Sequence, residues 1–166
     1  QLPTDQWGTF TFFAAATKQT HYKTQLLPAA PLVENVGKSY GYPVELKGNA
    51  SVTWSRGPYS VGWTMRYWSS YDVADLSVAS NLIYATNQGG ATVASQTYHD
   101  VFVRYRYRSA GAAGWKSWLS DTELLLGVRN LFNREPPFDA RNSATAYSFF
   151  GDPQLASYYV SLRKKL

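Results

Sequence analysis

The chain has 166 residues, a formal net charge of +5 and no cysteine. Without cysteine, neither a disulfide framework nor a cysteine-based metal site is available. Lysine and arginine are scattered rather than gathered in basic runs, so the positive charge does not indicate a nucleic acid as partner. No run of about 18 apolar residues occurs, which excludes a transmembrane helix. A barrel strand needs only about 9–11 residues with apolar side chains at alternate positions.

Alternating apolar and polar side chains predict antiparallel β-strands, since successive side chains of a strand point to opposite faces. The predicted strands cover residues 7–17, 44–55, 59–69, 98–108, 122–132 and 158–166. A minimal turn at Arg56-Gly57-Pro58 joins the second and third strands into the clearest hairpin. Residues 73–85, VADLSVASNLIYA, are compatible with either a short helix or a short strand. The fold class is therefore all-β, an antiparallel meander of about six long strands.

The connections between these strands alternate in length. Residues 18–43, 71–97 and 133–157 are long and rich in turn-forming residues, whereas residues 56–58 are few and residues 109–121 form a connection of moderate length. A transmembrane barrel has short turns at one rim and long loops at the other. On this interpretation the short turns and the C-terminus lie at the periplasmic rim, and the three long loops lie outside the cell.

Each predicted strand has one apolar face. In lipid this face points outward, whereas in a soluble β-sandwich it points into a shared core. Tyrosine and tryptophan near the strand ends favour lipid, because such side chains suit the headgroup level. We expect the lipid-facing residues to be Leu46, Val52, Trp54, Tyr59, Val61, Trp63, Met65, Tyr67, Val101, Val103, Tyr105, Leu124, Leu126 and Val128.

The opposite face carries arginine in mid-strand. We expect these arginines to be solvated in a wet lumen: Arg66, Arg104, Arg106, Arg129 and Arg163. The alternatives are that they pair with acidic groups of a plug or that they bias the lumen toward anionic ligands. Six strands are fewer than the roughly eight with which single-chain barrels begin. Alone, the chain is expected to form an open, curved sheet with two unpaired edges and a large exposed apolar face.

The end of the chain resembles a known family. GVRNLFNREPPF (residues 127–138), GDP (151–153) and SYYVSLRKKL (157–166) resemble, in order, the C-terminal end of TonB-dependent outer-membrane receptors. The hairpin at residues 49–71 resembles one that the family places a little upstream, and SDTELLLGVRNLF (120–132) extends the likeness. The resemblance implies that residues 1–166 are the C-terminal portion of a plugged barrel of about 22 strands, without the N-terminal plug and the earlier strands.

The same resemblance implies a function in active uptake. The family imports scarce ligands such as iron–siderophore complexes, cobalamin or oligosaccharides across the outer membrane of Gram-negative bacteria. The expected partners are outer-membrane lipid, a scarce nutrient ligand, the TonB complex through the missing N-terminal part, and the outer-membrane assembly machinery. This segment would supply barrel wall, extracellular loops and a C-terminal assembly signal of Tyr158, Val160, Leu162 and Leu166. Family members usually end in Phe, so Leu166 is expected to weaken that signal without abolishing it.

No catalytic, cofactor or metal site is predicted, and an enzyme is not expected. The two histidines, His21 and His99, lie far apart, and His99 is expected to be an ordinary rim residue. Aromatic and basic residues of the long loops are candidates to face a ligand vestibule, although the sequence singles out no one of them: Tyr40, Tyr42, Tyr84, Arg141, Tyr147, Phe149 and Phe150. The alternative function is a soluble β-sandwich carbohydrate-binding module in which Trp63 and Tyr67 stack on sugar.

Overall fold

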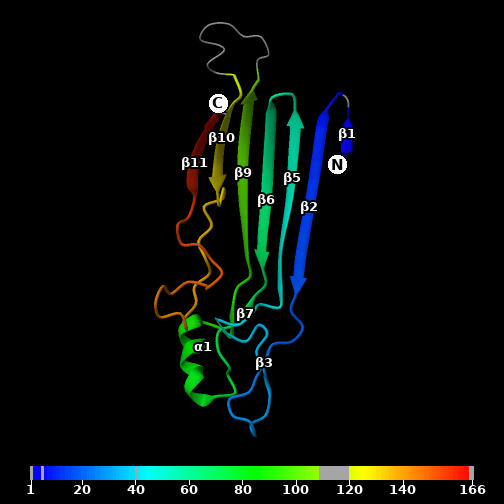
Figure 1. Cartoon of the computed structure of the whole chain (residues 1–166). Helices are drawn as coiled ribbons and strands as arrows, with labels where there is room; N and C mark the ends of the chain where they lie inside the picture. The colour runs from blue at the N-terminus through cyan, green and yellow to red at the C-terminus, as the bar shows by residue number, and fades with distance from the viewer. Residues whose placement is uncertain (1, 5, 40, 109–119, 165–166) are drawn as a thin grey trace.

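The computed structural model describes residues 2–4, 6–39, 41–108 and 120–164. In this part of the chain the dominant element is one antiparallel sheet in which each strand pairs with the next along the chain (Figure 1). Its long strands are β2 (Gly8–Lys18), β5 (Leu46–Arg56), β6 (Tyr59–Trp68), β9 (Gln96–Tyr107), β10 (Thr122–Arg129) and β11 (Ser157–Lys164). The short β1 (Leu2–Thr4) pairs with the start of β2. The sheet is open, with β1 at one edge and β11 at the other.

The predicted strands are confirmed as a meander, with shifted ends. The sequence pattern predicts that the fifth strand runs to Phe132, which is wrong, because β10 ends at Arg129. Asn130 follows with a left-handed backbone (φ 52°), which ends the extended conformation. Its side chain then holds Arg134, accepting a bond from the Arg134 N–H (2.9 Å) and donating one to the Arg134 carbonyl (2.8 Å). Leu131 and Phe132 continue the apolar pattern of β10 in the sequence, but in the structure they belong to a tight turn.

The long connections all lie at one end of the sheet, and the short turn at Gly57 lies at the other (Figure 1). The first long connection contains β3 (Lys23–Thr24) and β4 (Val33–Glu34), and the second contains β7 (Tyr71–Asp72) and β8 (Thr92–Val93). The segment that the sequence left between helix and strand is helical, with a 3-10 turn (Ala79–Asn81) and α1 (Leu82–Gln88). Most of the connection predicted at residues 109–121 lies outside the described residues.

The hydrophobic core lies beneath the loops and not on the sheet. Its fully or almost fully buried apolar side chains are Val44, Tyr71, Val73, Ala74 and Val93. Residues from the second and third long connections pack against them, including Tyr84, Ala140 and Phe150. Among the described helices, none is long and apolar enough to cross a membrane. The loop end is therefore a packed unit, built from segments that are far apart in the sequence.

Candidate functional site

The strand register gathers the apolar side chains on one face of the sheet. Two neighbouring rows cross all six long strands: Phe10, Trp54, Val61, Val103, Leu126 and Val160, then Phe12, Val52, Trp63, Val101, Val128 and Tyr158. All the residues that the sequence predicts to face lipid share this face, as do Tyr158, Val160 and Leu162 of the predicted assembly signal. Leu166 lies outside the described residues.

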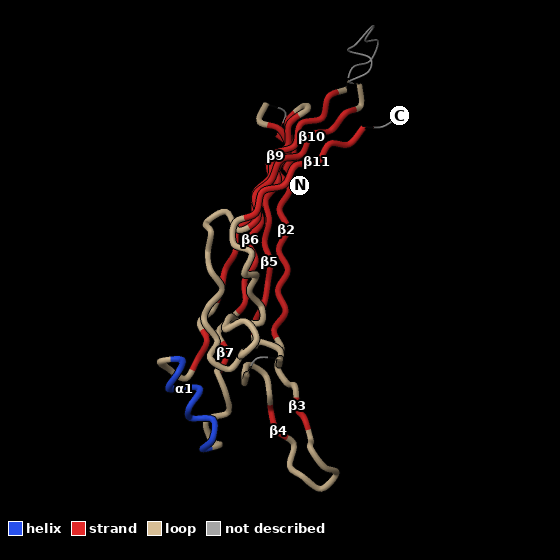
Figure 2. The backbone as a smooth tube through the Cα atoms, turned by 90° about the vertical axis from the view of Figure 1, so that its left-hand side faces the viewer, coloured by secondary structure: helices blue, strands red, loops and turns tan. Residues whose placement is uncertain are grey.

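Much of this apolar face is open, although mid-strand side chains such as Trp63 and Val101 are half-buried by their neighbours in the sheet. Val103 is 48% exposed, Leu126 46% and Val160 72%. Within the described residues each long strand packs chiefly against its neighbours in the sheet, and no second sheet lies over the face, so the long strands form a single layer (Figure 2). The β-sandwich alternative requires such a second layer, and the described part of the chain does not provide it. Exposed apolar area of this extent marks a surface that meets lipid or a protein partner.

Aromatic rings flank both ends of the apolar face. Near the short turn, the rings of Tyr59 and Tyr105 lie 5.1 Å apart. Trp63, in the middle of β6, stacks with His99 at 5.4 Å, and His99 meets Phe132 edge-on at 5.1 Å. Tyr67 lies nearest the long loops on the same face of β6. His99 is thus packed within an aromatic cluster on the apolar face of the sheet.

The arginines of the opposite face pair within the sheet. Arg66 contacts Asp100 at 3.1 Å, and the same carboxylate accepts the Asn130 N–H at 2.9 Å. Glu123 pairs with Arg106 at 2.6 Å and lies 3.6 Å from Arg104. These three arginines keep 37–43% of their side chains exposed, as expected of solvated charges, and they also meet carboxylates on neighbouring strands, which the sequence did not predict. Arg129 instead lies over the ring of Tyr159, 5.7 Å from its centre, and Arg163 stands opposite Glu123 in the register.

Two glycines of this polar face receive aromatic rings from the adjacent strand. The ring of Phe102 covers Gly62, and the ring of Tyr159 covers Gly127, so that a Cβ at either glycine would overlap the ring. Gly62 faces Phe102 directly in the register, and Gly127 faces Tyr159. A ring seated on a glycine shields backbone and fixes strand register. A glycine opposite an aromatic at polar parity is the sequence signal that could have found these pairs.

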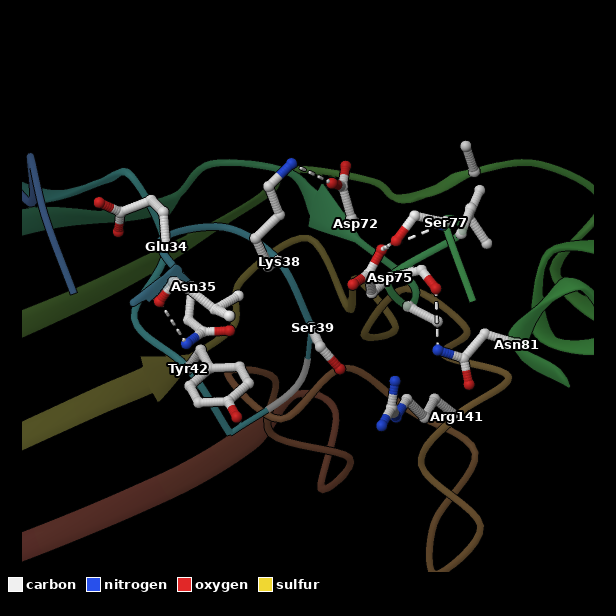
Figure 3. Close-up of a pocket in the computed structure, with 14 residues that line it drawn as sticks. Glu34, Asn35, Lys38, Ser39, Tyr42, Asp72, Asp75, Ser77, Asn81 and Arg141 are labelled. Carbon is white, nitrogen blue, oxygen red and sulfur yellow. Dashed lines mark hydrogen bonds and ion pairs between the residues drawn. The ribbon is translucent and has the colours of Figure 1, made fainter. Parts of the chain in front are cut away.

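A polar cleft of about 520 Å³ lies at the loop end (Figure 3). All three long connections contribute to it. Tyr42 and Arg141, two of the candidate vestibule residues, are part of its lining, whereas Tyr84 and Phe150 pack on the loop core and Tyr40 lies outside the described residues. The polar side chains around the cleft are Glu34, Asn35, Lys38, Ser39, Tyr42, Asp72, Asp75, Ser77, Asn81 and Arg141.

A buried polar cluster behind the cleft joins the second and third long connections. The Tyr71 hydroxyl donates to Asp139 at 2.6 Å and lies 3.2 Å from the Ser148 hydroxyl, to which the Gln96 amide donates at 2.6 Å. Asp139 also accepts the backbone N–H of Arg141 at 3.0 Å. Burial, followed by the bond to Asp139, raises the pKa of Tyr71, so the phenol remains a donor. The cluster therefore fixes the backbone from which Arg141 reaches the cleft.

Among the described residues no group of three or more histidine, aspartate or glutamate side chains is arranged to hold a metal ion. No protein-family model, no curated protein and no solved structure matches the chain.

Proposed function

We propose that the chain forms the C-terminal strands of the barrel of an outer-membrane TonB-dependent receptor, which takes up a scarce ligand. In this role the apolar face lies against lipid, the arginine-bearing face lines the lumen, and the packed loops lie outside the cell. TonB, the assembly machinery and the ligand belong to the proposal through the family resemblance. The chain's own contribution is wall, loops and assembly signal rather than chemistry.

The observation that carries the proposal is the exposed apolar face. Apolar rows cross six strands and stay open on the side away from the arginines. In water such an exposed apolar face favours aggregation, whereas in a bilayer it contacts the acyl chains of lipid. The Tyr59 and Tyr105 rings near the short turn and the Tyr67 side chain near the long loops suit the two headgroup levels of a bilayer. Short turns at one end and long connections at the other fit the two rims of a barrel.

The separated pieces of the family resemblance also meet in space. Pro136, in the first piece, packs against Gly151, in the second, where a Cβ would overlap the proline ring. Asn133 accepts the N–H of Ala156 at 2.9 Å, just before β11 begins. These contacts support treating the motif as one structural unit that returns the chain from β10 to β11.

Single cysteines test the orientation of the sheet, since the chain has none of its own. Val61→Cys lies on the apolar face of β6, and Thr64→Cys lies on the polar face of the same strand. Each variant of the natural gene is expressed, and outer-membrane vesicles are treated with a water-soluble maleimide. We expect slow labelling for Val61→Cys and faster labelling for Thr64→Cys. A fluorophore forced onto Val61→Cys in detergent should then be quenched by brominated lipid after reconstitution.

Equal labelling of the two cysteines, or recovery of the protein in the soluble fraction, would contradict the proposal. Ser80→Cys in the exposed part of the second long connection is the positive control, because its label should react rapidly in intact cells if the loops are extracellular.

A further inference from the structure

Five charged side chains among the described residues line the cleft at the loop end. Glu34, Asp72 and Asp75 supply three carboxylates, and Lys38 and Arg141 supply two cations. Which of these charges is free to meet a ligand depends on the partners that each already has within the described residues.

Every carboxylate of the cleft is already engaged. Asp72 pairs with Lys38 at 3.0 Å. Asp75 accepts bonds from the hydroxyl and the N–H of Ser77, at 2.6 and 3.0 Å. The Ser77 bonds come first among the causes that lower the pKa of Asp75, and the charges of Lys38 and Arg141 add to them, so Asp75 acts on Arg141 through space without forming an ion pair with it.

Of the three carboxylates, Glu34 accepts the most hydrogen bonds from described residues. It accepts the N–H of Tyr22 at 2.7 Å, the ring of His21 at 2.9 Å and the N–H of Val36 at 3.2 Å. These bonds, first that from Tyr22, lower the pKa of Glu34 to about 2. Glu34 serves to close the base of the β3–β4 hairpin.

Arg141 is the exception. Its guanidinium lies 5.5 Å from the centre of the Tyr84 ring, and in the described part of the chain it forms neither an ion pair nor a side-chain hydrogen bond. Figure 3 shows it pointing into the cleft, with the Ser39 hydroxyl directed toward the same space. Two contacts fix the position of Arg141. Its guanidinium lies over the Tyr84 ring, and its backbone N–H donates to the buried Asp139 carboxylate. A positioned guanidinium with open donors fits an oxyanion, which it binds through two parallel bonds.

We propose that the loop cleft binds an oxyanion group, a carboxylate or a phosphate, of a polar ligand, with Arg141 as the principal contact and the Ser39 hydroxyl as a second donor. The inference rests on the proposed function only for the side of the membrane that the cleft faces. Binding itself depends on the loops alone, so it can fail while the barrel proposal stands, and the reverse also holds.

The experiment is calorimetric titration of the full chain, refolded in a non-ionic detergent, with citrate, with inorganic phosphate and with neutral maltotriose. We expect saturable binding of citrate, phosphate or both, and none of maltotriose. A preference between the two anions identifies the source of the oxyanion. Arg141→Gln should weaken anion binding by about 10- to 100-fold, the range for a lost charged hydrogen-bond pair.

Arg56→Gln is the matched control, because it removes the same charge from an exposed position at the opposite end of the sheet. Its anion affinity should equal that of the unaltered chain. Arg141→Lys keeps the charge but lacks the planar guanidinium, so its anion affinity should lie between those of Arg141→Gln and Arg56→Gln. Failure of both anions to bind the unaltered chain would overturn the inference. Equal losses in Arg141→Gln and Arg56→Gln would do the same, since they would show attraction to net charge rather than a site.

Discussion

In the sheet, Val103 and Leu126 remain almost half exposed, whereas at the loop end Val73 and Val93 are completely buried. Both pairs are aliphatic side chains on or beside β-strands, so the difference does not come from residue type. It depends on whether another part of the chain packs over the side chain. The loops fold over one another and enclose a core, while one face of the longest strands meets no described element. A chain that buries its loops and exposes its strands is arranged oppositely to a soluble sandwich, whose strands enclose the core.

The contrast indicates that the two regions rely on different sources of stability. The loop end has its own buried apolar cluster and a hydrogen-bonded polar cluster behind it. The sheet has cross-strand pairs, ion pairs and rings seated on glycines, but its apolar face needs an external cover. Under the proposed function that cover is lipid. The two regions should therefore respond differently to the same kind of change.

The largest effect is expected for a charge on the apolar face. Val101→Arg lies mid-strand, opposite Trp63, and should lower the free energy of unfolding from lipid vesicles by about 2–4 kcal/mol, the cost of arginine at mid-bilayer on a barrel exterior. Thr64→Arg is the control, because it lies at similar depth on the other face, opposite Asp100. Urea titrations followed by tryptophan fluorescence measure both. A similar loss in the two variants would remove the distinction between the faces.

The next effect concerns the polar cluster of the loop end. Asp139→Ala leaves the buried Tyr71 hydroxyl with Ser148 alone and removes the acceptor of the Arg141 N–H. We expect a loss of about 3 kcal/mol, because a charged acceptor is removed and buried donors lose their partner. Hydrogen exchange should accelerate at the amide of Val73 and stay unchanged at that of Val103. Faster exchange throughout the sheet would show that the two regions unfold as one.

The smallest effect concerns pH at the β3–β4 hairpin. The pKa of Glu34 is lowered to about 2 from an ordinary value of 4.5. A lowered pKa in the folded state contributes stability that is present above pH 4.5 and is lost as the pH falls toward 2. Hydrogen exchange at the Tyr22 and Val36 amides, which Glu34 accepts, should therefore increase across this window after correction for the intrinsic rate. Glu34→Gln should remove the pH dependence, and its persistence would assign the effect to another group.

Much of the sheet could be predicted from alternation. The apolar parity of residues such as Val61, Val103 and Leu126 placed them on one face, and the register aligns them there. Because side chains alternate with a period of two, each strand has only two possible assignments of its faces. An error of one residue would have moved all side chains of that strand to the opposite face. Strand ends were less predictable. Leu131 and Phe132 continue an apolar sequence, but the left-handed Asn130 ends β10 before them.

The loop end could not be predicted in the same way. Tyr71, Gln96, Asp139 and Ser148 are separated by up to 77 positions, and nothing in their local pattern distinguishes them from exposed loop residues. Arg141 was one of several candidates for the vestibule, and only its contacts with Tyr84 and Asp139 single it out. Pairing of the polar-face arginines was likewise missed, because Asp100 and Glu123 lie on neighbouring strands.

The sequence by itself determined the all-β meander, the division of each strand into an apolar and a polar face, and the placement of long and short connections. These are local properties, set by the alternation of side chains along an extended backbone and by turn-forming residues. Only the tertiary structure decided where the core lies, which charges are paired and which guanidinium remains open in the loop cleft. Those outcomes depend on contacts between distant segments, and such contacts are set by packing and complementary hydrogen bonding rather than by local propensity.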